Sequence, residues 1–312
     1  MSLAAFLAAL PLLYWPHPTE TAEALRRAGI ARLGVPREEA AAWRRAGFAA
    51  VPLGERDLAA RVKLPAPGLL ARADVASATL RPWVFANGWR FRREPEARYL
   101  YELPAGKAAL GAAEAFAGGV DAVLAIEPAD LGDLGRMLGF LGELPSEELP
   151  PVADLAVVDD GSALVGEVMN LLARRNLLFR VVRAPAADLP VNVELGTDDY
   201  PKADAADPDG LALAVRRRLG DDRRSLRLFG SEVVLGRLAG DAGRVRLHLV
   251  NYGGRDLQGL RVRLRGSWGP GEARVAGRGR VAVEDHRVRE GTTEFSLPEM
   301  GIHAMVELPA LR

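Results

Sequence analysis

The stretches ALRRAGIA at residues 24–31 and AWRRAGFA at residues 42–49 decide the fold, because they are two copies of one structural unit. Each copy reads as a helix end, a capping glycine (Gly29 or Gly47) and a short apolar strand, and the copies are about 18 residues apart. Strands joined by single helices run parallel, with right-handed crossovers. The sequence therefore predicts an α/β fold with a parallel sheet.

Apolar runs on either side of this repeat continue the alternation of strands and helices through the first half of the chain. Residues 54–76 differ, because Pro65 and Pro67 interrupt the pattern, and we expect mostly loop there. Pro36 stands where a helix can begin, since proline is tolerated in the first turn. The expected elements are strands over 12–15, 30–35, 48–53, 78–85, 98–101 and 120–126, and helices over 19–29, 36–47, 107–116 and 131–144.

Residues 145–151, PSEELPP, indicate a linker, because proline and exposed charge leave little apolar surface to bury. Strands and helices alternate again beyond it, which predicts a second, doubly wound α/β domain over 151–238. Asp159-Asp160 follows the first strand of this domain, where two carboxylates would repel a phosphate. We therefore expect the domain to be a scaffold or an oligomerisation module. The expected elements are strands over 154–158, 177–182 and 226–234, and helices over 162–175 and 211–219.

The hydrophobic period changes to two from about residue 242 onward. Val245, Leu247 and Leu249 alternate with Arg246 and His248, and glycine-rich turns separate this run from the next ones. Alternation interrupted by such turns predicts short antiparallel strands. Residues 239–312 are therefore predicted to form an all-β sandwich domain.

The composition excludes several classes of function. Lys and Arg together number 41, as do Asp and Glu, so the formal charge is zero and nucleic acid is not expected as a partner. Near-neutrality removes one barrier to self-association, which is consistent with a homo-oligomer. The chain has no cysteine, which excludes disulfides and thiolate chemistry, and its four histidines are too scattered for metal-ligand spacing. We expect neither a metal nor a cofactor.

The N-terminal run MSLAAFLAALPLLYW, residues 1–15, is the continuous apolar segment that raises a membrane question. It is too short to span a membrane as a helix. Its length suits the apolar region of a signal peptide, yet it lacks preceding basic residues and a clear cleavage site. The alternative is a first helix that leads into a buried strand. The location, secreted or periplasmic against cytoplasmic, stays open.

The stretch WVFANGWRFRREPEARYLYELPAG, residues 83–106, holds the main candidates for a functional site. Glu102 closes a strand just before a Pro-Ala-Gly turn, and α/β barrels place catalytic groups at the carboxyl ends of their strands. Glu127 ends the next expected strand, so both carboxylates can face one edge and act as a catalytic pair. Glycosidases hold such a pair about 5–9.5 Å apart. The alternatives are an ion pair of Glu102 with an arginine of this stretch, and a capping role for Glu127.

Aromatic and amide side chains can bind a sugar, because a ring offers a broad apolar face and an amide bonds hydroxyl groups. Alternation along a strand sends Tyr99 and Tyr101 to the face opposite Glu102, so we expect core packing for both tyrosines. The alternative for Asn87 is a turn at Asn87-Gly88, and the alternative for His17 is a structural or exposed histidine. The candidates for substrate binding are Trp15, His17, Trp83, Asn87, Trp89 and Arg90.

Three segments give the chain a resemblance to a known family: YLYELPAGKAALGAAEAFAGGVDAVL (99–124), VADLAVVDDGSALVGEVMNLLARRNLLFRVV (152–182) and RVRLHLVNYGGRDLQGLRVRL (244–264). Their order resembles bacterial glycoside hydrolases of the clan A type, in the arrangement of the barrel-containing β-galactosidases. The resemblance implies a TIM-barrel-like domain over 1–147, a flavodoxin-like or glutamine-amidotransferase-like domain over 151–238, and the C-terminal β domain. The first segment is short for an eight-stranded barrel, so an incomplete barrel is expected.

The resemblance also implies a carbohydrate as partner, bound or cleaved at the carboxyl edge of the barrel-like domain. Enzymes of this type use two glutamates, and Glu102 matches the place of the nucleophile. The acid/base glutamate usually follows an asparagine, and no Asn-Glu pair exists in the chain, so that role stays unassigned. The alternative is a non-catalytic scaffold or interaction protein derived from the glycosidase fold. A third option is an enzyme on another small substrate that uses His17 and Glu102.

Overall fold

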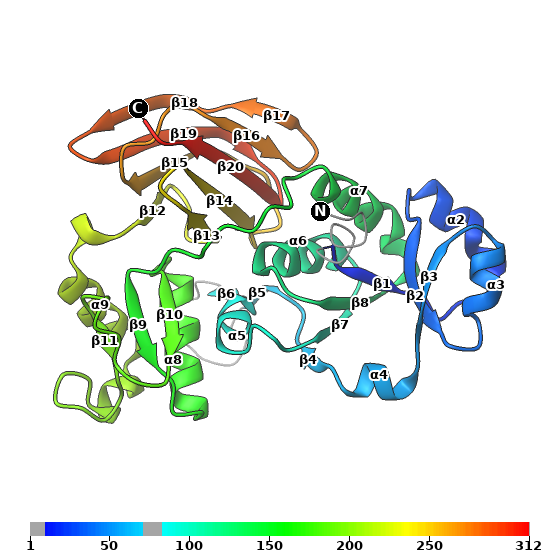
Figure 1. Ribbon diagram of the computed structural model, residues 1–312, viewed down its shortest axis with the longest axis horizontal. Helices are drawn as coiled ribbons and strands as arrows, with labels where there is room; N and C mark the ends of the chain where they lie inside the picture. The colour runs from blue at the N-terminus through cyan, green and yellow to red at the C-terminus, as the bar shows by residue number, and fades with distance from the viewer. Residues whose placement is uncertain (1–9, 71–82, 312) are drawn as a thin grey trace. The chain divides into compact units, whose positions relative to one another are not determined.

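The computed structural model describes residues 10–70 and 83–311 and shows a mixed α/β chain with parallel and antiparallel sheets (Figure 1). The chain divides into two compact units. The first unit is Met1–Gly68 together with Glu94–Ser146, and the second is Leu69–Arg93 together with Glu147–Arg312. The helix considered for the N-terminal apolar run lies outside the described residues.

A six-stranded parallel sheet forms the centre of the first unit, in the order β3-β2-β1-β8-β7-β4 (Figure 1). The last strand of the unit, β8, pairs with the first, β1, which is how a parallel barrel closes. β3 and β4 are the two edge strands of this order, so the described strands make an open parallel sheet. The strands are β1 (Leu12–Tyr14), β2 (Arg32–Pro36), β3 (Ala49–Leu53), β4 (Val62–Leu64), β7 (Tyr99–Leu103) and β8 (Ala122–Ile126).

Helices connect these strands, as the repeat in the sequence predicts. Gly29 and Gly47 follow α2 and α3 with φ of 74° and 91°, the left-handed conformation that glycine adopts without strain at a helix end. α6 and α7 pack against each other (Figure 1). The helices are α2 (Ala22–Arg27), α3 (Ala40–Arg45), α4 (Glu55–Ala59), α6 (Ala108–Gly118) and α7 (Leu131–Gly142), with short 3-10 turns η1 (Thr19–Thr21) and η2 (Pro128–Asp130).

Two predictions for this unit are wrong. Pro36 ends β2 instead of opening a helix, because its residue pairs in register with Leu53 of β3. Residues 54–70 are not mostly loop, since they form α4, β4 and β5 (Gly68–Leu70), and Pro65 and Pro67 stand between the two strands. The prolines therefore separate short elements without abolishing them.

The two faces of the six-stranded sheet differ in what they contact. Tyr101 donates a hydrogen bond to the buried Glu114 of α6, and Leu103 packs against Gly111 of the same helix. Leu100 and Val123 are register neighbours on the opposite face, in an apolar cluster with Leu12 and Leu53. Side chains alternate along a strand, so Glu102 shares the face of Leu100 and points away from α6.

The second unit contains a three-stranded parallel sheet in the order β10-β9-β11, with one βαβ crossover through α8. Trp89 of α5 lies in the core of this layer and packs against α8. Asn87-Gly88, predicted as a turn, instead begins α5, because Arg90 donates its backbone N–H to the Asn87 carbonyl. The elements are α5 (Gly88–Arg93), β9 (Leu155–Val158), α8 (Ala163–Arg174), β10 (Phe179–Val182), β11 (Asn192–Val193) and α9 (Pro208–Leu219), with β6 (Trp83–Phe85) paired to β5.

Two antiparallel sheets follow, in the orders β12-β15-β19-β18 and β13-β14-β20-β16-β17, and their inner faces share one apolar core. β12 and β13 cover most of 226–234, which the sequence predicted for the parallel domain; both are antiparallel strands here. The strands are β12 (Leu226–Phe229), β13 (Val234–Gly240), β14 (Arg244–Asn251), β15 (Leu257–Arg265), β16 (Glu272–Val275), β17 (Gly279–Ala282), β18 (Glu284–Arg289), β19 (Thr292–Met300) and β20 (His303–Pro309).

Candidate functional site

Glu102 and Glu127 lie at the carboxyl ends of two neighbouring parallel strands. Glu102 of β7 is the register partner of Ala125 in β8. Glu127 follows Ala125 by two residues and keeps an extended backbone, so it is at the same edge as Glu102. Both side chains are exposed to solvent. The structure thus places both predicted carboxylates, exposed, at one edge of the sheet.

Glu102 is held in an ion pair with Lys63. The Lys63 Nζ atom donates to Glu102 Oε1 at 2.8 Å, and the two side chains are 68% and 61% exposed. An exposed pair contributes only about 0–1 kcal/mol, because water competes for both charges. The partner is a lysine of β4 and not an arginine of residues 83–106, because β4 is the strand that pairs with β7. A ligand can therefore displace this lysine at little cost.

Tyr14 of β1 lies in the same row across the sheet as Glu102, although the sequence analysis did not identify it as a candidate. It pairs in register with Ala125, which pairs in turn with Glu102, so the three share one row and one face of the sheet. Burial raises the pKa of the Tyr14 phenol, and the charges of Glu38 and Glu55 raise it further. The hydroxyl group therefore stays protonated at neutral pH and can donate a hydrogen bond.

The loop after Glu102 is fixed by Asp130, a second residue that the sequence did not mark. The Asp130 carboxylate is 6% exposed and accepts from the backbone N–H of Gly106, at 2.8 and 2.9 Å, and from Ala108 at 3.4 Å. It therefore satisfies the first N–H group of α6 and one N–H group of the loop before it, and complements the positive helix start. The signal in the sequence is an aspartate three residues after Glu127, in the turn that follows the neighbouring strand.

Trp15 and His17 do not form an open binding surface. Trp15 is 2% exposed, and its ring nitrogen donates to Thr21 Oγ1 at 2.9 Å. The His17 ring lies 4.3 Å from the Trp15 ring, centroid to centroid. These contacts match the structural alternative for a lone histidine, since the tryptophan is part of the core and the histidine covers it.

The other four binding candidates belong to the second unit, whereas Glu102 and Glu127 belong to the first. Trp83 is half-buried and Asn87 is fully buried. Trp89 is 7% exposed and packs against Gly166 of α8, and the Arg90 guanidinium lies 4.3 Å from the Trp89 ring centroid. Continuity in sequence suggested one site over residues 83–106, but the chain changes units at Glu94.

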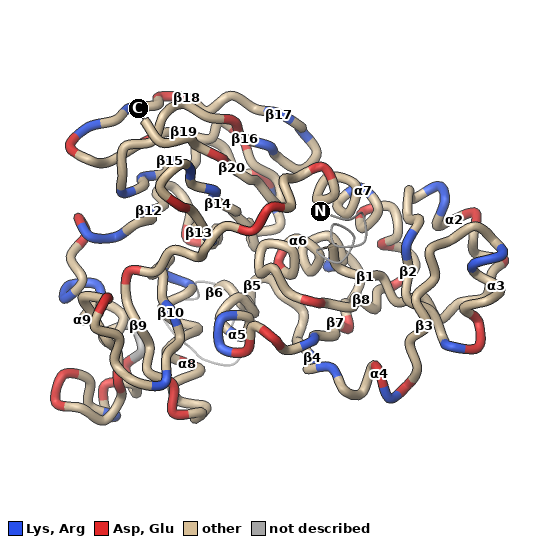
Figure 2. The backbone as a smooth tube through the Cα atoms, in the orientation of Figure 1, with Lys and Arg blue, Asp and Glu red and all other residues tan. Residues whose placement is uncertain are grey.

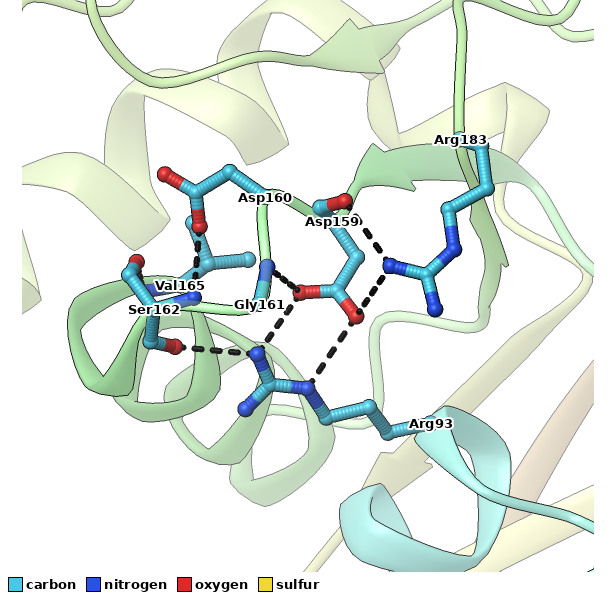
Figure 3. Close-up of polar contacts among 7 residues, drawn as sticks. All are labelled: Arg93, Asp159, Asp160, Gly161, Ser162, Val165 and Arg183. Atoms are coloured by element: carbon cyan, nitrogen blue, oxygen red, sulfur yellow. Dashed lines mark hydrogen bonds and ion pairs between the residues drawn. The ribbon is translucent and has the colours of Figure 1, made fainter.

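A buried carboxylate, Asp159, follows β9 at the carboxyl edge of the three-stranded sheet (Figure 3). Arg93 of α5 donates to both oxygens, at 2.7 and 3.1 Å, and the Gly161 backbone N–H donates at 3.0 Å. The exposed Arg183 approaches one oxygen at 3.5 Å. The side chain of Asp159 is only 2% exposed, so it is not accessible to a ligand in solution.

The neighbours of Asp159 complete the start of α8 (Figure 3). Ser162 is the N-cap, and its hydroxyl accepts from the Val165 backbone N–H at 3.2 Å. Asp160 accepts from the Ser162 backbone N–H at 2.8 Å, and Arg93 also donates to the Ser162 carbonyl at 3.0 Å. Because these groups bond one another, the Asp159-Asp160 turn is a structural joint between α5 and α8.

Across residues 10–70 and 83–311, no group of three or more acidic or histidine side chains is placed to hold a metal ion. His248 and His303 lie 3.3 Å apart, Nδ1 to Nε2, as a pair on adjacent strands. Among the helices that the structure describes, none is long and apolar enough to span a membrane.

Comparison with known proteins gives fold likeness without sequence likeness. No protein-family model and no curated protein matches the chain. The structure is similar to α-L-fucosidase isoenzyme 2 from Paenibacillus thiaminolyticus over 69% of this chain and 61% of that chain, with 10% identity and a TM-score of 0.54. This likeness shows that the chain has a glycoside-hydrolase-like fold, and that it spans less than two thirds of the fucosidase chain.

Two β-galactosidases are more distant. The enzyme from Rahnella sp. matches 72% of this chain and 56% of its own, with 11% identity and a TM-score of 0.39. The enzyme from G. stearothermophilus matches 78% and 53%, with 8% identity and a TM-score of 0.32. Neither likeness carries an argument about function.

Proposed function

We propose that this protein binds a carbohydrate at the carboxyl edge of β7 and β8, with Glu102 as the main hydrogen-bond acceptor. The observation that carries the proposal is the pair of exposed carboxylates, Glu102 and Glu127, on neighbouring parallel strand ends of a glycoside-hydrolase-like fold. Parallel α/β folds use this edge for ligands because the strand ends and their loops converge there.

The chemistry of the row suits sugar hydroxyl groups. A carboxylate accepts two or more hydrogen bonds from vicinal hydroxyls, Lys63 donates to hydroxyl oxygens, and the protonated Tyr14 can do both. Charged groups make the stronger hydrogen bonds to neutral ligands. Asp130 supports the site by holding the loop that follows Glu102.

Binding is favoured over hydrolysis. A general acid needs a carboxyl group held away from water, so that it keeps its proton at neutral pH. Glu102 is 61% exposed and paired with Lys63, so it is not held away from water. The acid/base role therefore has no candidate with suitable surroundings among Glu102 and Glu127.

The second candidate function is a scaffold or interaction protein derived from the same fold. It is favoured by the burial of Trp15 and Trp89, since aromatic rings inside the core are not available to stack on a sugar. Under this proposal the predicted amidotransferase-like domain, 151–238, contributes structure and contacts between subunits.

A thermal-shift screen against mono- and oligosaccharides tests the proposal, because a ligand that binds the folded state raises the melting temperature by mass action. We expect a sugar that stabilises the wild type and fails to stabilise Glu102→Gln. Glu23→Gln is the matched control, since Glu23 is an exposed acid paired with Arg26 in the same unit. Equal shifts in all three proteins would move the site elsewhere, and no shift with any sugar would favour the scaffold function.

A further inference from the structure

Arginines are concentrated on the strands β12, β15 and β18 of the sheet β12-β15-β19-β18, where the backbone is coloured blue in Figure 2. On β15, Leu260, Val262 and Leu264 point into the core, so the residues between and after them point outward. The neighbouring strands add arginines in register on the same face. We define the arginine face as Arg227, Arg261, Arg263, Arg265, Arg287 and Arg289.

The register places these side chains in rows across the sheet. Arg227 of β12 lies directly opposite Arg263 of β15, and Arg263 lies opposite Glu294 of β19, which lies opposite Arg287 of β18. In the next row Arg265 and Arg289 flank a threonine, Thr292. Like charges directly opposite each other destabilise a sheet. Nothing in the packing of the inner face requires arginine at these outward positions.

Few carboxylates neutralise this face. Glu294 is shared by Arg261 and, at 3.7 Å, by Arg263. Asp221, at the edge beside β12, is shared by Arg227 at 3.3 Å, Arg224 at 3.4 Å and Arg216 at 2.7 Å. Arg216 and Arg224 lie outside the arginine face, so Asp221 is only partly available to neutralise Arg227. Arg289 pairs with the neighbouring Glu290 at 3.3 Å, and Glu284 of β18 is the register partner of Ser296. The six arginines of the face still outnumber these four carboxylates.

We propose that the arginine face binds an acidic polysaccharide, a sugar chain that carries carboxylate or sulfate groups. Guanidinium groups bind planar oxyanions through paired hydrogen bonds, and outward residues on one strand repeat at about 6.7 Å, which suits a chain laid along β15. Phe229 is 39% exposed at the end of β12, with the Arg227 guanidinium 5.1 Å from its ring centroid. Its ring adds an apolar surface for a sugar ring.

A polysaccharide fits this face better than a nucleic acid does. Proteins that bind nucleic acid usually carry a basic charge overall and several exposed aromatic rings that stack on bases. This chain has zero formal charge, and Phe229 is the sole aromatic side chain among the outward residues of the four described strands. The face is part of the β domain, so the inference is independent of sugar binding at Glu102.

Binding of fluorescein-labelled polygalacturonate, measured by fluorescence anisotropy on the full chain, tests the inference. We expect binding that weakens steeply as salt rises from about 50 to about 200 mM, as for any polyanion held by ion pairs. The triple variant Arg261→Gln, Arg263→Gln, Arg265→Gln should bind about tenfold or more weakly. Neutral dextran should not bind either protein.

A matched control separates the face from general charge. The triple variant Arg27→Gln, Arg45→Gln, Arg56→Gln removes the same charge from exposed positions of the first unit, and its affinity should stay within about twofold of wild type. Equal weakening in both triple variants would overturn the inference. So would tighter binding of single-stranded DNA than of polygalacturonate, or no binding of polygalacturonate at low salt. Circular dichroism of each variant verifies that the β domain is folded.

Discussion

The substitution Asp159→Asn should strongly destabilise the second unit. The Asp159 carboxylate is 2% exposed and accepts two hydrogen bonds from Arg93 and one from Gly161. Asparagine keeps the shape but removes the charge, which leaves the guanidinium of Arg93, itself only 15% exposed, without its counter-ion. Breaking a buried ion pair from one side costs about 3–5 kcal/mol.

The second unit spans Leu69–Arg93 and Glu147–Arg312. For a unit of this size, each kcal/mol lowers the melting temperature by about 2–4 °C, so we expect a decrease of about 6–20 °C. Urea denaturation followed by circular dichroism gives the free energy of unfolding, and differential scanning calorimetry gives the temperature.

Asp188→Asn is the matched control, because Asp188 is 65% exposed and pairs with Arg180 in the same unit. We expect no measurable change from it. The double variant Arg93→Met, Asp159→Leu should be more stable than Asp159→Asn, since apolar side chains can replace a buried pair without leaving a lone charge. A cost below about 1 kcal/mol for Asp159→Asn, or a cost no larger than that of Asp188→Asn, would show that the buried ion pair does not stabilise the unit.

Three further predictions concern packing, capping and pH. A Cβ atom at Gly135 in α7 would lie 1.8 Å from the carbonyl oxygen of Ala28, the C-cap of α2. Gly135→Ala should therefore lower the free energy of unfolding by about 1–3 kcal/mol in the same urea assay. The control Gly139→Ala has open space around its Cβ atom and should raise the free energy of unfolding by about 0.5–1 kcal/mol. Asp130→Ala leaves backbone N–H groups at the start of α6 without acceptors and should cost about 1–3 kcal/mol, with faster hydrogen exchange in that loop as the second readout. Burial lowers the pKa of His303 to about 3. The pKa of His248 is held well below its usual value by burial and by the neighbouring His303. Both histidines are therefore neutral in the folded state at neutral pH. Between about pH 6.5 and 5, these two histidines bind protons only in the unfolded state. The free energy of unfolding should therefore fall, as the pH falls, by up to about 1.4 kcal/mol per pH unit for each histidine. A free energy of unfolding that stays constant over this range would contradict the prediction.

Much of the fold follows from local sequence patterns. The repeated helix end, glycine and strand at 24–31 and 42–49 predicted α2, β2, α3 and β3, because a left-handed glycine and an apolar run are both local signals. Side-chain alternation along the strand predicted core packing for Tyr99 and Tyr101, and this is confirmed, since both are buried and Tyr101 bonds Glu114 of α6. These features depend on residues close together in the chain.

The errors arise where distant segments decide the outcome. Residues 83–93 read as part of one continuous site, yet Trp89 and Arg93 complete a layer built by residues beyond 147. The alternative for Glu102 was an ion pair with a nearby arginine, but pairing of β4 with β7 brings Lys63 to it instead. No periodicity in the sequence encodes which strand becomes the neighbour.

The candidate site shows the same division. Glu102 and Glu127 could be placed at one edge from strand order alone, because both end consecutive strands. Tyr14 and Asp130 could not be predicted as site residues. The position of Tyr14 depends on the strand register across the sheet, and the role of Asp130 depends on a hydrogen bond from another loop. Register and loop contacts are set by the assembled sheet.

Hydrogen exchange measured with and without a sugar tests carbohydrate binding at the β7–β8 edge. The sugar used is the one that gives the largest thermal shift, at a concentration that saturates the protein. We expect slower exchange in peptides that cover residues 99–108 and 127–130, and loss of this protection in Glu102→Gln. Protection confined to other segments, or unchanged protection in Glu102→Gln, would contradict it.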